Sequence, residues 1–79
     1  MERDQGISCH LDRLLEEKGM TLVELSAQVG ISVANLSILK NNRARAVRFS
    51  TLAALCRVLD CEPGDLFSYQ EGAPQHETP

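Results

Sequence analysis

Residues 21–48, TLVELSAQVGISVANLSILKNNRARAVR, decide the fold of this 79-residue chain. Thr21 and Glu24 have the spacing of a capping box: the threonine hydroxyl accepts from the backbone N–H three residues on, and the glutamate reaches back to the threonine N–H. The box predicts a short helix over residues 22–29. Gly30 follows at the position where a left-handed residue ends such a helix.

A second helix is predicted after a very short turn. Ser32 is a favourable N-cap for a helix over residues 33–41, and Ile31 is expected to fill the gap between the two crossing helices. Two leucines fall on the inner face of this helix, Leu36 and Leu39. The other positions point elsewhere: Val33, Ala34, Ser37, Ile38 and Lys40. Two short helices joined by a glycine-containing turn of about three or four residues are typical of a helix-turn-helix unit.

The stretch resembles the lambda-repressor-like (Cro/XRE) family, whose pattern is roughly T-x-x-E-L-A-x-x-x-G-I/V-S-x-x-x-I/L-S-x-L/I/W-x-N/K-G/N-K/R. The matching residues are Thr21, Glu24, Leu25, Gly30, Ile31, Ser32, Leu36, Ser37, Leu39, Asn41, Asn42 and Arg43. Ser26 stands where the family usually has alanine, and Asn42 where it usually has glycine. With its flanks the resemblance covers residues 8–69 and implies an all-α, compact five-helix DNA-binding domain.

The segment before the helix-turn-helix unit has the periodicity of a buried helix. Leu11, Leu14 and Leu15 form one apolar stripe. Gly19 is expected to end this helix, after which Met20 folds back onto the core. The sequence therefore predicts a first helix that packs its leucines against the central unit.

The segment after the unit is predicted to be helical as well. Ser50 is the expected N-cap of a fourth helix, and Phe49 is expected to cover its start. The apolar stripe of this helix comprises Leu52, Leu55, Cys56 and Leu59. Pro63 suits the first position of a short last helix over residues 63–67.

The two ends of the chain carry weaker signals. Residues 1–7 are expected to be a flexible N-terminus, and residues 70–79, which lack apolar periodicity, a disordered tail. Residues 8–69 then form the single domain that this length allows. Residues 7–9 and 67–69 are short and β-prone, so they could pair as a small ladder, within or between chains.

The distribution of charge matters more than the net charge of −3. No acidic residue lies between Glu24 and Asp60, an interval that holds five basic residues: Lys40, Arg43, Arg45, Arg48 and Arg57. The rest of the chain holds all 11 acidic residues. A basic patch beside a helix-turn-helix unit is typical of a surface that contacts DNA phosphates. The alternative is a solvated loop with chance clustering of charge.

The resemblance implies that the helix over residues 33–41 lies in the major groove with its N-terminal residues at base edges. The implied base-facing residues are Val33, Ala34, Asn35, Ser37 and Ile38. This surface lacks the arginine or glutamine that binds a base in bidentate fashion. Either its apolar side chains contact thymine methyl groups, or DNA shape and the arginines supply specificity. Asn35 could instead bond backbone within the domain, and Ile38 could pack on a neighbouring subunit.

Phosphate contacts are expected around this helix. The candidates are Thr21, Ser32, Lys40, Asn41, Arg43, Arg45 and Arg48. Many relatives have glutamine where Leu22 stands, and leucine cannot hold a phosphate in the same way. Backbone N–H groups at the start of the helix over residues 22–29 could still bind phosphate. We expect Arg43, Arg45 and Arg48 to be the positioning residues, so removing any one should weaken binding at all sequences about equally.

Other functions find little support. Cys9, Cys56 and Cys61 are an odd number without a paired framework, which favours a reducing cytosol. Together with His10 they match no zinc spacing, although Cys61 and Cys56 could form a redox switch. The sequence contains no catalytic constellation, cofactor motif, membrane span or evident small-molecule site, so we expect no enzyme.

The sequence thus predicts a cytoplasmic bacterial or phage-type regulator, more specifically a repressor that occupies its operator. A dimer is expected, because one short helix contacts too few base pairs for useful specificity. A small core also gains stability from a partner subunit. The alternative is a protein-interaction module, in which the same fold presents the apolar face of residues 33–41 to another protein.

Overall fold

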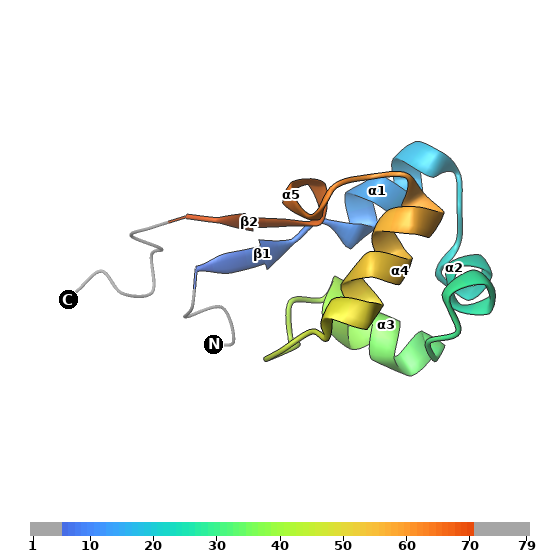
Figure 1. Ribbon diagram of the computed structural model, residues 1–79, viewed down its shortest axis with the longest axis horizontal. Coiled ribbons are helices and arrows are strands. Elements are labelled where there is room, and N and C mark those ends of the chain that lie inside the picture. The colour runs from blue at the N-terminus through green and yellow to red at the C-terminus, as the bar shows by residue number, and fades with distance from the viewer. Residues whose placement is uncertain (1–5, 71–79) are drawn as a thin grey trace.

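The computed structural model describes residues 6–70, which form five helices and two short strands. The order is β1 (Ile7–Cys9), α1 (Leu11–Lys18), α2 (Leu22–Val29), α3 (Val33–Lys40), α4 (Phe49–Leu59), α5 (Pro63–Leu66) and β2 (Phe67–Tyr69). The helices surround α4, and the two strands extend from one end of the helical body (Figure 1). The predicted five-helix architecture is confirmed.

Leucine supplies the whole buried core of the described chain. The buried residues are Leu11, Leu14, Leu15, Leu25, Leu36, Leu39, Leu55, Leu59 and Leu66, and no polar or charged residue among those described is buried with them. Burying one such side chain is worth about 1.5–3 kcal/mol. Each helix contributes at least one of these leucines, so every helix is held by the same cluster.

The small ladder predicted between residues 7–9 and 67–69 forms within the chain. β1 and β2 pair antiparallel, with Ile7 opposite Tyr69 and Cys9 opposite Phe67. A backbone bond from Gln70 N to Gly6 O at 3.0 Å extends the ladder at its outer end. Ile7 therefore belongs to a strand, although it was assigned to the flexible N-terminus. The expectations for residues 1–5 and 71–79 lie outside the described residues.

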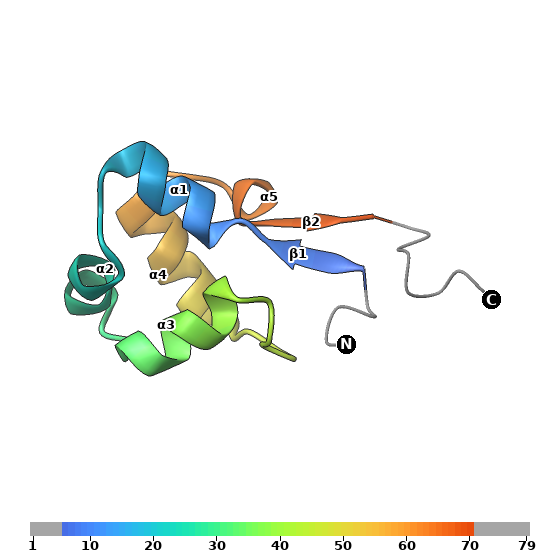
Figure 2. The same ribbon diagram turned by 180° about the vertical axis from the view of Figure 1, so that it is seen from behind.

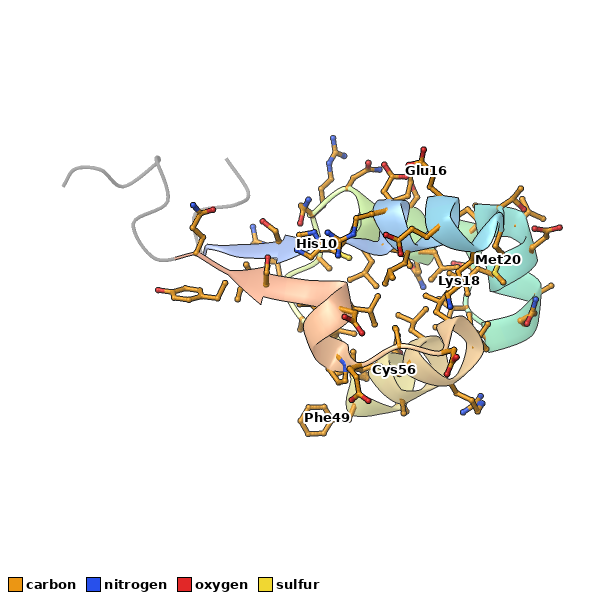
Figure 3. The ribbon with its side chains drawn as sticks, turned by 90° about the horizontal axis from the view of Figure 1, so that it is seen from above. His10, Glu16, Lys18, Met20, Phe49 and Cys56 are labelled. Atoms are coloured by element: carbon orange, nitrogen blue, oxygen red, sulfur yellow. The ribbon has the colours of Figure 1, made fainter. Side chains whose placement is uncertain are left out.

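The start of α4 differs from the prediction. The N-cap is Arg48, not Ser50, and it makes no side-chain capping bond. Arg48 is extended, and its carbonyl already accepts the first helical bond from Leu52 N at 2.9 Å. Phe49 therefore lies in the first turn, where its ring is 86% exposed instead of covering the helix start. Figure 3 shows this ring pointing away from α1.

Two other helices are one residue shorter than predicted. α3 ends at Lys40, and Asn41 is its C-cap with a φ of −93°. α5 ends at Leu66, because Phe67 turns into the extended conformation of β2. Among residues 6–70 no single helix is long and apolar enough to cross a bilayer; α2 and α3 reach that length and composition only when taken together across a 118° bend.

Candidate nucleic-acid interface

The turn between α2 and α3 is fixed by hydrogen bonds that its sequence provides. Gly30 ends α2 in the left-handed conformation, with a φ of 75°. Ser26 Oγ then donates to the carbonyl oxygen of Ile31 at 2.6 Å. Ser32 Oγ accepts from Asn35 N at 3.1 Å and begins α3. Ser26, which stands where the family usually has alanine, thus holds the turn with a bond that alanine cannot make.

This turn sets α3 at a large angle to α2. The chain bends by 118° between the two helices, close to the range of about 90–120° for a helix-turn-helix unit. Leu36 and Leu39 face the core, as predicted. α3 lies along the lower edge of the molecule in both Figure 1 and Figure 2, with no other described element beneath it. Its outer side is therefore open.

The predicted base-facing residues share that outer side of α3. Val33 is 39% exposed and Ile38 45% exposed, and Ala34 and Asn35 are exposed as well. Ser37 is half-buried, and its Oγ accepts from Asn41 Nδ2 at 3.2 Å. None of these side chains is charged, so the outer face of α3 itself offers no ion pair to a ligand.

The loop that carries the arginines is held at both ends of its first turn. Asn42 has a φ of 63°, the left-handed conformation that the family glycine would adopt. Arg43 N donates to Ile38 O at 3.0 Å. The Asn42 Oδ1 accepts from Cys9 N at 2.6 Å, which ties the loop to β1. Asparagine thus supplies both the backbone conformation and a tether that glycine lacks.

A groove of about 580 Å³ lies between α3 and this loop, and we call it the arginine groove. Arg43, Arg45 and Arg48 line it together with Asn35 and Ile38 of α3. None of the three guanidinium groups forms an ion pair with a residue in the described part of the chain. Sequence reasoning missed Val47 and Thr51 as lining residues, because neither has a charge or a motif position to mark it.

Three of the predicted phosphate-contact residues do not line the arginine groove: Thr21, Lys40 and Asn41. Lys40 Nζ lies 3.8 Å from Asp12 Oδ1 of α1, and the lysine side chain is 29% exposed. Thr21 Oγ1 accepts from Glu24 N at 3.1 Å in the predicted capping box. Ser32 lines the groove, whereas Arg57 lies in the last turn of α4. The basic interval of the sequence is thus split by the fold into separate surfaces.

The comparisons with known proteins give the class of this protein. Residues 10–72 match the model of the Cro/C1-type helix-turn-helix DNA-binding domain. The chain therefore belongs to the Cro/C1-type helix-turn-helix family of DNA-binding regulators, which are not enzymes.

A curated relative supports the same assignment. The chain is 50% identical over 65 residues to the uncharacterized HTH-type transcriptional regulator YozG of Bacillus subtilis (strain 168), an alignment that covers 82% of this chain and 77% of YozG. The protein is thus a helix-turn-helix transcriptional regulator of bacterial type.

A solved structure supports the fold. A chain of the SinR protein/SinI protein complex superimposes with a TM-score of 0.67 at 26% sequence identity, covering 89% of this chain. The match spans 63% of that chain, so the neighbour is longer than the domain described here. The lambda-repressor-like fold predicted from the sequence is confirmed.

Proposed function

We propose that this regulator is a repressor that occupies operator DNA with α3 in the major groove. One observation carries the proposal: the 118° bend sets the uncharged outer face of α3 beside a groove lined by three arginines without described ion pairs. A major groove about 12 Å wide admits one α-helix, and the arginines would then meet the phosphates at its edge. Such a protein acts in the cytoplasm, where the bacterial chromosome lies.

The proposed base-contacting residues are those on the exposed side of α3. Val33, Ala34 and Ile38 would contact thymine methyl groups, and Ser37 would donate its hydroxyl hydrogen, since its oxygen already accepts from Asn41. The Asn35 side chain makes no hydrogen bond to another described residue. Its amide is therefore available to a base edge, which favours the base-reading role over bonding within the domain.

The phosphate contacts are unequal. Arg43, Arg45 and Arg48 would carry most of the affinity, with Ser32 and Asn41 beside them. Lys40 and Thr21 would contribute less, because Asp12 neutralises the lysine and the threonine is engaged in its capping box. A single α3 contacts few base pairs, so we propose a homodimer that binds two half-sites about one helical turn apart.

Selection of bound sequences from a random duplex library tests this proposal. We expect an inverted repeat with half-sites about 10 base pairs apart, centre to centre, and with thymines at the apolar contact positions. A single unrepeated half-site would contradict the dimer. An output without any consensus would contradict base reading. The Arg43→Ala/Arg45→Ala/Arg48→Ala variant is the control, and it should recover little DNA at the same salt concentration.

A protein-interaction module is the second candidate function. The uncharged face with Val33 and Ile38 half-exposed favours it, and the structural neighbour was solved in a complex named for two proteins. Under this alternative, binding to duplex DNA would be absent or independent of salt, whereas phosphate-driven binding weakens steeply as salt rises.

A further inference from the structure

The end of α4 brings two of the three cysteines together. Asp60 ends this helix in the left-handed conformation, with a φ of 54°. Cys61 N then donates to the carbonyl oxygen of Cys56 at 3.0 Å. In this Schellman type of helix ending, a contact between the side chains of the two residues joined by the six-to-one bond is frequent. The turn therefore sets the Cys61 side chain against that of Cys56.

The same ending at α1 shows what the fold requires at this place. Gly19 is left-handed there, with a φ of 64°. Met20 N donates to Leu15 O at 3.0 Å, and Met20 packs on the core beside the buried Leu15. An ordinary apolar contact is thus sufficient to close such a turn. Two thiols at the corresponding positions of α4 bring chemistry that the turn itself does not need.

The surroundings of the two sulfurs agree with close contact. Both side chains are half-buried against the leucine core. Burial, the neighbouring Cys56 sulfur and a hydrogen bond between the two thiols raise the pKa of Cys61 to about 11, with Asp65 adding to the shift. Lys18 opposes it; this lysine ends α1, on the side that faces α4 (Figure 3).

Cys9 has no such partner and serves as an internal comparison. It lies in β1, opposite Phe67 and beside the start of the arginine loop. Burial raises the pKa of its thiol, although a hydrogen bond from the Leu11 backbone lowers it in part. The chain thus contains one thiol pair and one single thiol in different parts of the fold.

We propose that Cys56 and Cys61 are a disulfide-forming site that closes within one chain by exchange with a low-molecular-weight disulfide such as oxidised glutathione. One protein thiolate attacks a sulfur of the external disulfide, which forms a mixed disulfide and releases one small thiol. The second protein thiolate attacks the protein sulfur of that mixed disulfide and releases the other. Two protein S–H bonds become one S–S bond, and the external disulfide takes up the two electrons and two protons.

The position of the site predicts which properties change on closure. The pair lies at the C-terminal end of α4, and the arginine groove reaches only its N-terminal turn, at Thr51. An 11-residue helix is about 16 Å long. We therefore expect closure to change DNA affinity less than about twofold, so the site modifies the end of α4 and does not switch DNA binding.

The sequence itself supplies a sharp assay, because Arg57 lies between the two cysteines. Trypsin cleaves after arginine, so Cys56 and Cys61 leave on separate peptides, residues 49–57 and 58–79, unless a disulfide joins them. After native protein is incubated with oxidised glutathione at pH 9 and then alkylated, we expect the joined peptide to exceed mixed disulfides at these cysteines by about tenfold. The rate should rise with pH, because the thiolate is the reactive form.

Five single-residue variants complete the test: three at the cysteines and two at Asp60. Cys9→Ser should form the joined peptide as the parent does, whereas Cys56→Ser and Cys61→Ser should stop at the mixed disulfide. Asp60→Gly preserves the left-handed turn and should close at a rate within about twofold of the parent, whereas Asp60→Val strains it and should close more slowly. Separate glutathione adducts on residues 49–57 and 58–79, or pairing with Cys9 or with a second chain, would overturn the proposal. Each of these readouts is independent of DNA binding.

Discussion

The basic residues on the two flanks of α3 differ in whether an acidic residue lies close to them. On one flank, Arg43, Arg45 and Arg48 line a groove, without ion pairs to the described residues. On the other, Lys40 lies 3.8 Å from Asp12. The two flanks are adjacent in sequence, and both belong to the same basic run. The difference teaches that the fold, not the charge count, decides which cations can reach a phosphate.

Removal of the three arginines should have the largest effect. Arg43→Ala/Arg45→Ala/Arg48→Ala deletes three proposed phosphate contacts, so the slope of log affinity against log salt should become shallower by about 2.7 units. Affinity at low salt should fall on the order of 100-fold. Fluorescence anisotropy with a labelled duplex measures both. Arg57→Ala, which removes the same charge outside the groove, should leave the slope unchanged.

Loss of the hydrogen bond from Cys9 N to Asn42 Oδ1, which ties the arginine loop to β1, should have the second-largest effect. Asn42→Ala should lower the free energy of unfolding by about 2 kcal/mol, because alanine strains the left-handed position and leaves Cys9 N–H without its acceptor. Asn42→Gly removes only the acceptor and should lose about 1 kcal/mol. Asn42→Asp keeps the acceptor and should lose less. Urea unfolding ranks the three variants; a midpoint for Asn42→Gly equal to that of the parent would show that the tether contributes nothing.

The outer face of α3 should govern preference more than affinity. Ile38→Ala removes the proposed contact with a thymine methyl group, which should weaken binding to a selected operator by about fivefold. Binding to random duplex should not change, because phosphate contacts remain. Competition between the two duplexes measures the ratio. An equal loss on both would assign Ile38 to stability or to the dimer, not to base reading.

The smallest effect is expected on the lysine flank. Lys40→Ala should change DNA affinity less than about twofold and leave the salt slope within the error of the parent. The reason is that Asp12 Oδ1 lies 3.8 Å from Lys40 Nζ and offsets its charge. A slope that falls by a full unit would place Lys40 among the phosphate contacts and remove the distinction between the two flanks.

Local sequence signals predicted the fold well, because several independent signals indicate the same helices. The capping box at Thr21, the left-handed Gly19 and Gly30, and the leucine periodicity each appear in the structure as expected. The start of α4 was wrong because Ser50 has the stronger capping preference, yet the extended Arg48 already begins the helix.

The site was less predictable, because it depends on contacts between distant segments. The ion pair of Lys40 with α1 and the bond from Cys9 to Asn42 join residues that no local pattern relates. The residues that line the arginine groove also include Val47 and Thr51, whose side chains carry no charge. Position in the sequence identified the arginines as a group, but only the fold separates them from Lys40 and Arg57.

The salt dependence of binding to a random duplex tests the central claim most directly. If three arginines beside α3 meet the DNA phosphates, the parent protein must bind duplex at low ionic strength, with a log–log salt slope of about −2.7 or steeper. A protein that shows no binding at low salt, or a slope near zero, would contradict the account.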